Sequence, residues 1–199
     1  MVKIVSIIMF VGCFAFSSVL KASLFPDIDI NSPDLTVEKA AKQCQKSLMH
    51  APEQLEAWCE KAYRLGHWEA LYYIGVHTGD GSRYLEEINT RIANNENSAL
   101  KKLAWIYRSG HFVEKDLKES ARLYELYLLS SDSEINFQSV SAHFELATIY
   151  QKLGMWNKVI FHTDYVINYA NRTDWEHRAQ YIQNQAKASL AENKSLNKN

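Results

Sequence analysis

The sequence predicts an all-α protein of the α-solenoid class, in which successive helix pairs stack around a continuous core. Three observations predict it. The 199-residue chain has three prolines, and none follows Pro52, so no proline interrupts a helix after that point. Apolar residues in this region recur every three or four positions, which is the period of an α-helix. A short pattern of small, large apolar and aromatic residues also repeats along the chain.

The repeated pattern consists of residues suited to close helix packing, followed by a glycine suited to a turn. Ala99-x3-Leu103-Ala104-x2-Tyr107-x2-Gly110 returns as Ala142-x3-Leu146-Ala147-x2-Tyr150-x3-Gly154. In each copy, a small residue stands beside a large apolar one, and a Tyr follows three positions later. All three lie on one helical face, and the small residue lets two helix axes approach each other. Recurrence of such a unit is typical of a solenoid.

Nine helices are predicted, each with a local signal at one end or both. Pro52 suits the first turn of a helix, where a missing N–H costs nothing. Gly66 and Gly110 suit the position after a helix end. Asp116-x2-Glu119 and Thr173-x2-Glu176 suit helix starts of the capping-box type. The predicted helices cover residues 36–49, 52–65, 67–78, 82–94, 98–109, 116–130, 137–152, 155–170 and 173–191.

Four segments follow from these patterns. Residues 1–22 form a signal peptide, 23–35 a linker, 36–191 a single repeat domain and 192–199 a disordered polar tail. Stacked helix pairs share one elongated core, so we expect no internal domain boundary.

The N-terminus has the composition of a secretory leader. Lys3 precedes an apolar run over residues 4–20, and Ala22-Ser23 offers a small-residue cleavage point. We therefore expect an exported, periplasmic protein. Two alternatives stay open: an uncleaved run of this length could anchor the chain in a membrane, and Val11-Gly12-Cys13 is similar to a lipoprotein box, with acylation at Cys13.

Removal of the leader leaves two cysteines, Cys44 and Cys59. An even pair in an exported chain indicates a disulfide. Each lies about two turns from the break at Pro52, so the two can face each other across an antiparallel helix pair. The bond would close a loop of about 15 residues and contribute about 3 kcal/mol. Two buried free thiols or a two-cysteine metal site are the other readings.

The charge balance argues against two classes of partner. The chain has 22 Lys and Arg against 23 Asp and Glu, without the basic excess of nucleic-acid-binding domains. Basic blocks that would mark a membrane-surface helix are also missing. A local basic patch created by folding stays open.

Two segments resemble the Sel1-like branch of the tetratricopeptide repeats. Lys61-Ala62-x3-Gly66-His67-x2-Ala70-x3-Ile74-Gly75 is similar to the junction between two such units. Residues 99–124, with Gly110-x2-Val113-x-Lys115-Asp116 inside them, resemble nearly a whole unit. The resemblance covers roughly 36–170 as about four units, with the ninth helix as a cap. Thr78 stands where the family has Tyr, and the turn at residues 79–81 lacks the Val-x-Lys-Asp element, which leaves the curvature open.

The resemblance implies a partner-binding concave surface formed by the first helix of each pair. Trp, Tyr and Arg on such a surface are typical binding anchors. The residues implied are Glu69, Tyr72, Lys101, Trp105, Arg108, Phe144, Thr148 and Gln151. Trp68, Tyr107, Tyr124 and Tyr150 are instead expected to fill the core.

Known catalytic and metal-binding patterns do not occur in the sequence. None of the seven histidines stands in a His-x3-His or His-Glu-x2-His pattern, and no nucleophile elbow or phosphate loop is present. His67 and His111 each follow a turn glycine and are expected to be turn residues. We therefore expect a protein without enzymatic activity, cofactor or metal.

The functional expectation is a monomeric protein–protein interaction adaptor. Envelope assembly and immunity against an envelope-directed toxin both suit a small exported solenoid. Two alternatives stay open: a cell-wall-binding or hydrolytic protein of the cysteine-rich Sel1-like type, and a structural lipoprotein acylated at Cys13.

Overall fold

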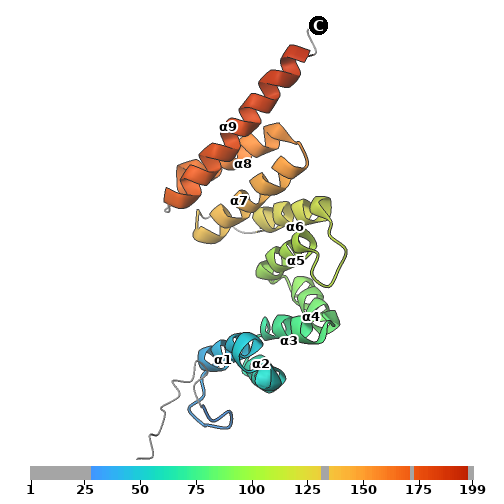
Figure 1. The fold of residues 1–199 in the computed structure, drawn as a ribbon, viewed down its shortest axis with the longest axis vertical. Coiled ribbons are helices and arrows are strands. Elements are labelled where there is room, and N and C mark those ends of the chain that lie inside the picture. Colours follow the sequence, from blue (N-terminus) through green and yellow to red (C-terminus); the bar gives the residue numbers. More distant parts are fainter. Residues whose placement is uncertain (1–27, 131–134, 171–172, 197–199) are drawn as a thin grey trace, which may run out of the picture.

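The computed structural model describes residues 28–130, 135–170 and 173–196, and these residues are helical with no strand among them (Figure 1). They form nine α-helices and one 3₁₀ turn, so the predicted all-α class and helix number are confirmed. The bounds are α1 Val37–His50, η1 Pro52–Gln54, α2 Leu55–Arg64, α3 Ala70–Thr78, α4 Ser82–Ala93, α5 Asn97–Ser109, α6 Leu117–Ser130, α7 Phe137–Lys152, α8 Trp156–Tyr169 and α9 Thr173–Leu196.

Local chemistry sets most of these ends. The Thr36 hydroxyl accepts a hydrogen bond from the Lys39 amide and caps α1. Gly79 and Gly110 take the left-handed conformation that ends α3 and α5. Proline at residue 52 opens a 3₁₀ turn rather than α2, so the second helix begins three residues later than predicted.

The predicted capping box at the start of α6 is only half formed. The Asp116 carboxylate accepts from the amides of Lys118 and Glu119, as expected. The Glu119 carboxylate pairs with Arg122 instead of returning to the cap. A complete box occurs where we predicted none, between Asn136 and Ser139 at the start of α7.

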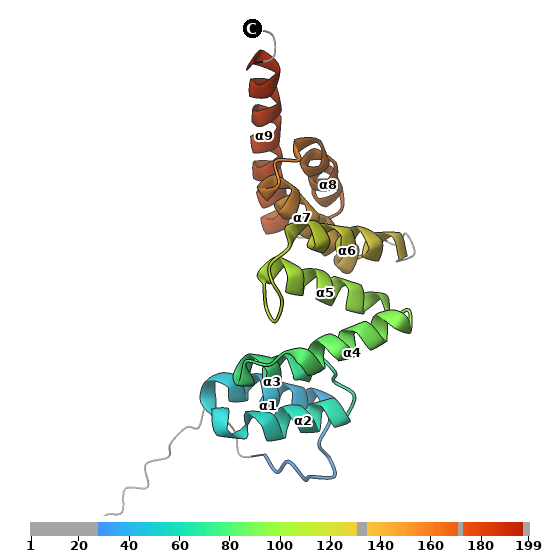
Figure 2. The same ribbon diagram turned by 90° about the vertical axis from the view of Figure 1, so that its right-hand side faces the viewer.

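Helix α9 is longer than its sequence pattern predicted. It continues to Leu196 instead of ending near residue 191, so residues 192–196 of the predicted tail are helical. Its C-terminal part extends beyond α8 (Figure 2). Glu192 and Lys194 are good helix formers, and the Ser195 hydroxyl donates to the Glu192 carbonyl within the same helix.

The helices follow one another along an elongated body, with α1 and α2 at one end and α9 at the other (Figures 1 and 2). Helix α1 packs on α2, α5 on α6, and α7 on α8. Two clusters of buried apolar residues form the core, one over α1–α5 and one over α5–α9, and they meet at Ile92 and Leu103. Trp68, Tyr124 and Tyr150 are buried in these clusters as predicted, while Tyr107 is half-buried.

The predicted disulfide forms between Cys44 of α1 and Cys59 of α2. Both residues are fully buried and their Cα atoms lie 4.6 Å apart. Ahead of α1, in the segment predicted as a linker, Ile28, Ile30 and Leu35 pack against the N-terminal core cluster. The predicted signal peptide, including Cys13, lies outside the described residues. None of the described helices is long and apolar enough to cross a membrane.

A short loop between α5 and α6 ties together helices that are distant in sequence. Phe112 adopts a positive φ of 64°, which is rare for a large side chain. Its ring lies directly over Gly81, where a Cβ atom would be 2.0 Å from the ring carbon Cγ. Gly81 therefore leaves the space in which the α5–α6 loop closes onto the start of α4.

Candidate functional site

All eight residues predicted for the concave surface line one of two adjoining pockets. Three helices supply them: Tyr72 lies on α3 and Glu69 directly before it, and the others lie on α5 and α7. On α5 and α7 the spacing is i, i+4, i+7, which places each set on one helical face. The residues of α5 are Lys101, Trp105 and Arg108, and those of α7 are Phe144, Thr148 and Gln151.

The first pocket has a volume of about 540 Å³ and aromatic walls. The Tyr72 ring lines it and lies edge-on to Trp105 at 5.4 Å and to Tyr84 at 5.7 Å between ring centroids. Its hydroxyl forms a 2.9 Å hydrogen bond with Nδ1 of His111. The histidine that we predicted as a simple turn residue therefore holds an aromatic ring that lines this pocket.

The second pocket has a volume of about 750 Å³ and lies between α7 and α9. Phe144 lines it, stacked on Trp175 at 5.4 Å between ring centroids, with the Arg178 guanidinium 4.8 Å from the Phe144 ring centroid. Gln151 donates to the Gln185 side chain at 2.6 Å. The Thr148 hydroxyl donates to the backbone carbonyl of Glu145 and so is engaged within its own helix.

Ser141 and Glu145 of α7 line both pockets, so the two pockets adjoin, and together they are called the groove below. Glu145 accepts a hydrogen bond from Arg108. Burial raises the pKa of Glu145, although the positive charges of Arg108, Arg178 and Lys101 oppose this rise. Burial also lowers the pKa of Lys101, and the neighbouring Lys102 charge acts in the same direction.

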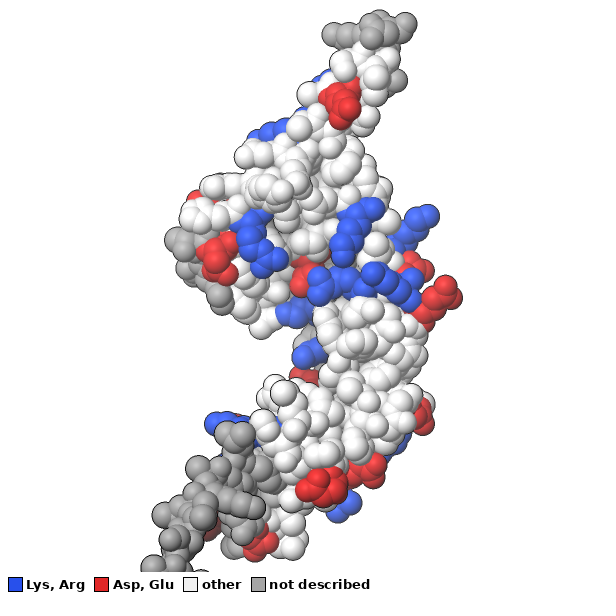
Figure 3. All heavy atoms as spheres, in the orientation of Figure 1, with Lys and Arg blue, Asp and Glu red and all other residues white. Residues whose placement is uncertain are grey.

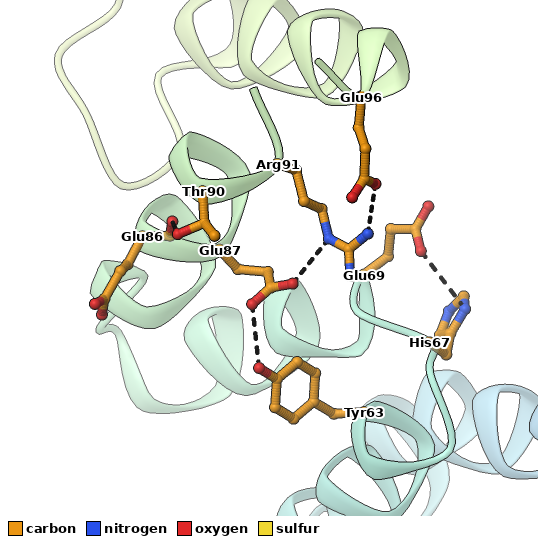
Figure 4. Close-up of polar contacts among 8 residues, drawn as sticks. All are labelled: Tyr63, His67, Glu69, Glu86, Glu87, Thr90, Arg91 and Glu96. Atoms are coloured by element: carbon orange, nitrogen blue, oxygen red, sulfur yellow. Dashed lines mark hydrogen bonds and ion pairs between the residues drawn. The ribbon is translucent and has the colours of Figure 1, made fainter. Parts of the chain in front are cut away.

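An ion-pair network lies beside the turn that leads into α3 (Figure 4). Arg91 donates to Glu87 at 2.8 Å and to Glu96 at 2.6 Å, and its guanidinium lies 4.8 Å from the Trp68 ring centroid. Tyr63 donates to the second oxygen of Glu87 at 3.1 Å. These contacts join α2, α4 and the start of α5, next to the turn that carries His67 and Glu69.

Within that turn, His67 Nδ1 lies 3.6 Å from a Glu69 carboxylate oxygen. The other Glu69 oxygen lies 3.6 Å from Lys102 Nζ. The predicted site residue Glu69 thus has two possible ionic partners, and it faces the first pocket from the α3 side.

Comparisons of the chain with protein-family models, curated proteins and solved structures find no match. Among the described residues, no group of three His, Cys, Asp or Glu side chains is placed to hold a metal ion. What the groove offers chemically is an aromatic surface with charged groups at its centre.

Sequence reasoning missed the contribution of α9 to the groove. Trp175, Arg178 and Ile182 line the second pocket, as does Tyr181, which is 64% exposed. We predicted α9 only as a cap. The i, i+3, i+7 spacing of the first three residues indicates a shared helical face and could have suggested a mixed aromatic and cationic surface.

A second cluster that the sequence did not reveal lies in the core between α7 and α8. His143 and His162 are buried, and the Tyr165 ring stacks on His143 at 3.7 Å between centroids. Beside them, Tyr150 donates to Glu125, which also pairs with Lys158 at 2.9 Å. The two histidines are 19 positions apart and on different helices, so no local motif could have indicated their contact.

Proposed function

We propose that this protein is an exported Sel1-like adaptor that binds a protein partner in the groove formed by α3, α5, α7 and α9. In this proposal the chain is an α-solenoid of about four helix pairs capped by α9. One observation carries the proposal. The eight residues expected on a concave binding surface come from three separate parts of the chain, and all of them line one of two adjoining pockets.

The composition of the groove supports a protein partner. Tyr72, Trp105 and Arg108 are residue types that dominate protein–protein interfaces energetically. The exposed Tyr181 adds a rigid aromatic surface that loses little conformational entropy on binding. The surrounding Ser141 and Gln151 side chains offer hydrogen-bonding groups of the kind found around interface anchors.

Export is part of the same proposal. The apolar leader over residues 4–20 and the buried disulfide of Cys44 with Cys59 both suit an oxidising compartment. A periplasmic role in envelope assembly, or in immunity against an envelope-directed toxin, fits a small binding protein of this kind. The immunity role requires tight one-to-one binding.

The test is affinity capture from the native envelope, with the mature chain from Ser23 onward as bait and mass spectrometry as the readout. A stoichiometric protein partner should be lost with Trp105→Ala and with Arg108→Glu. Phe161→Ala and Arg122→Glu are the matched controls, because both side chains are exposed and line neither pocket of the groove. Circular dichroism of every variant separates lost binding from lost folding.

Two results would contradict the proposal. A partner that the control variants also lose would place binding elsewhere on the molecule. Recovery of cell-wall glycan without any protein would favour the cell-wall-binding alternative.

A further inference from the structure

The place where the two pockets meet holds an excess of positive charge. Glu145 faces three cations there: Arg108, which donates to it, and Arg178 and Lys101, whose charges act on it through space. One carboxylate cannot neutralise three cationic side chains.

The same imbalance extends along the groove. Its lining contains five Lys or Arg side chains and two Glu side chains. Each Glu is matched by one cation, Glu145 by Arg108 and Glu69 by Lys102. In Figure 3 the outline of the molecule is indented at mid-height, and blue Lys and Arg side chains lie along that indentation.

The three remaining cations are Lys101, Lys152 and Arg178. Lys101 donates to the neutral side chain of Gln138, and Arg178 lies over the Phe144 ring. Within the described part of the chain, none of the three has a carboxylate within ion-pair distance. Their charges are therefore available to an anionic group from outside the molecule.

Aromatic surfaces lie on both sides of these charges. Tyr72, Tyr73 and Trp105 line one pocket, and Phe144 and Trp175 line the other. A ligand that fits the whole groove must therefore combine acidic groups with apolar ones. An acidic polysaccharide would match these charges but would leave the aromatic walls of the two pockets without an apolar partner.

We propose that the groove binds an extended acidic peptide segment of a partner protein, with carboxylates against Lys101, Lys152 and Arg178 and apolar side chains in the two aromatic pockets. This inference rests on the proposed function and specifies the chemistry of the partner. An extended chain suits the groove because its successive side chains can reach the central charges and the pockets on either side of them.

The test uses a phage-displayed library of random 12-residue peptides, selected on the mature protein. Selected peptides should be enriched in Asp and Glu together with aromatic or Leu residues. Their affinity, measured by fluorescence anisotropy, should fall at least tenfold in the double variant Lys152→Glu/Arg178→Glu. The matched control Lys118→Glu/Arg122→Glu carries the same charge change on residues outside the groove and should change affinity less than twofold.

Several outcomes would overturn the inference. Neutral or basic peptides that still need Trp105 would leave the proposed groove intact and reject only its acidic specificity. If both double variants weakened peptide binding equally, the loss of affinity would come from the change in net charge and not from the groove. Displacement of the peptide by an oligothymidylate of equal charge would reject the peptide class. Failure to select any peptide, with no partner in the envelope capture, would reject both proposals.

Discussion

The Nδ1 atoms of His143 and His162 lie 2.9 Å apart in the buried layer between α7 and α8. This contact is a hydrogen bond only when one Nδ1 carries a proton and the other keeps its lone pair. Protonation of both rings would place two N–H groups against each other away from water. Burial lowers the pKa of His143 to about 4, and burial together with the His143 charge lowers that of His162 to about 3.

Acidification should therefore destabilise the protein well above the pH at which its carboxylates titrate. Unfolded histidines take up protons near pH 6.5, whereas this folded pair stays neutral to about pH 4 and 3. The unfolded state binds more protons in this window, so the free energy of unfolding falls as the pH falls below 6.5. Each histidine contributes a slope of up to about 1.4 kcal/mol per pH unit.

Urea denaturation between pH 7 and pH 4.5 measures this slope. His143→Gln removes one of the two titrating groups and should flatten the dependence. His77→Gln, an exposed histidine at the end of α3, is the control and should leave the slope unchanged. An unaltered slope in the His143 variant would show that other groups cause the acid sensitivity.

The contrast between this pair and the helices shows what the sequence could predict. Helix positions were predictable because their signals are local: a cap such as Asp116 and a stop such as Gly110 act within one turn. The disulfide was predictable because both cysteines flank the same break at Pro52. The contact of His143 with His162 depends on how α8 is rotated against α7, which the helical period alone does not fix.

The groove was predictable to the same extent. The Sel1-like resemblance implied its α3, α5 and α7 residues, and these residues line the two pockets, while their role in binding stays a prediction. Trp175 and Arg178 were missed because α9 lies outside the repeat and was assigned no surface of its own. The loop before α6 was recognised, but the packing of Phe112 on Gly81 was not, because it joins residues 31 positions apart.

Replacing Gly81 with Ala tests that packing. Gly81 has an ordinary φ of −90°, so the added methyl group acts through its collision with Phe112 alone. We expect a loss of about 1–3 kcal/mol in the free energy of unfolding, which is typical of overpacking. Gly154→Ala is a useful comparison, because it adds a methyl in open space at a positive φ. In a Phe112→Ala background Gly81→Ala should cost much less, and an equal cost there would argue against the collision.

Reduction of the disulfide should destabilise the N-terminal helix pair. The bond between Cys44 and Cys59 closes a 15-residue separation, for which the chain-entropy model gives about 3 kcal/mol. Urea denaturation with and without a reductant measures the difference, and alkylation followed by mass spectrometry reports the thiol state. The double variant Cys44→Ala/Cys59→Ala should be insensitive to the reductant. If the reductant lowered the free energy of unfolding of that variant equally, the loss would have a cause other than this bond.

Arg91 should contribute more to stability than an exposed arginine with a similar ionic partner. Its side chain is 23% exposed, pairs with Glu87 and Glu96 and covers Trp68, so Arg91→Met should cost about 1–2 kcal/mol. Arg122 pairs with Glu119 but is 60% exposed, and Arg122→Met should stay within about 0.5 kcal/mol. Thermal unfolding of both variants gives the comparison. Equal losses would mean that burial of the Arg91 network adds nothing.

The wall that Ser141 and Glu145 provide to both pockets makes a ligand that spans the groove bivalent. Once one binding group of such a ligand occupies its pocket, the second group meets the other pocket at a high effective concentration. That concentration is set by the length of the ligand segment that joins the two groups. Linkage of this kind strengthens binding by about 10²–10⁴ over either anchor alone. Under the proposed function, a partner that changed one anchor would still be recognised through the other, while the spacing between the anchors would have to be kept.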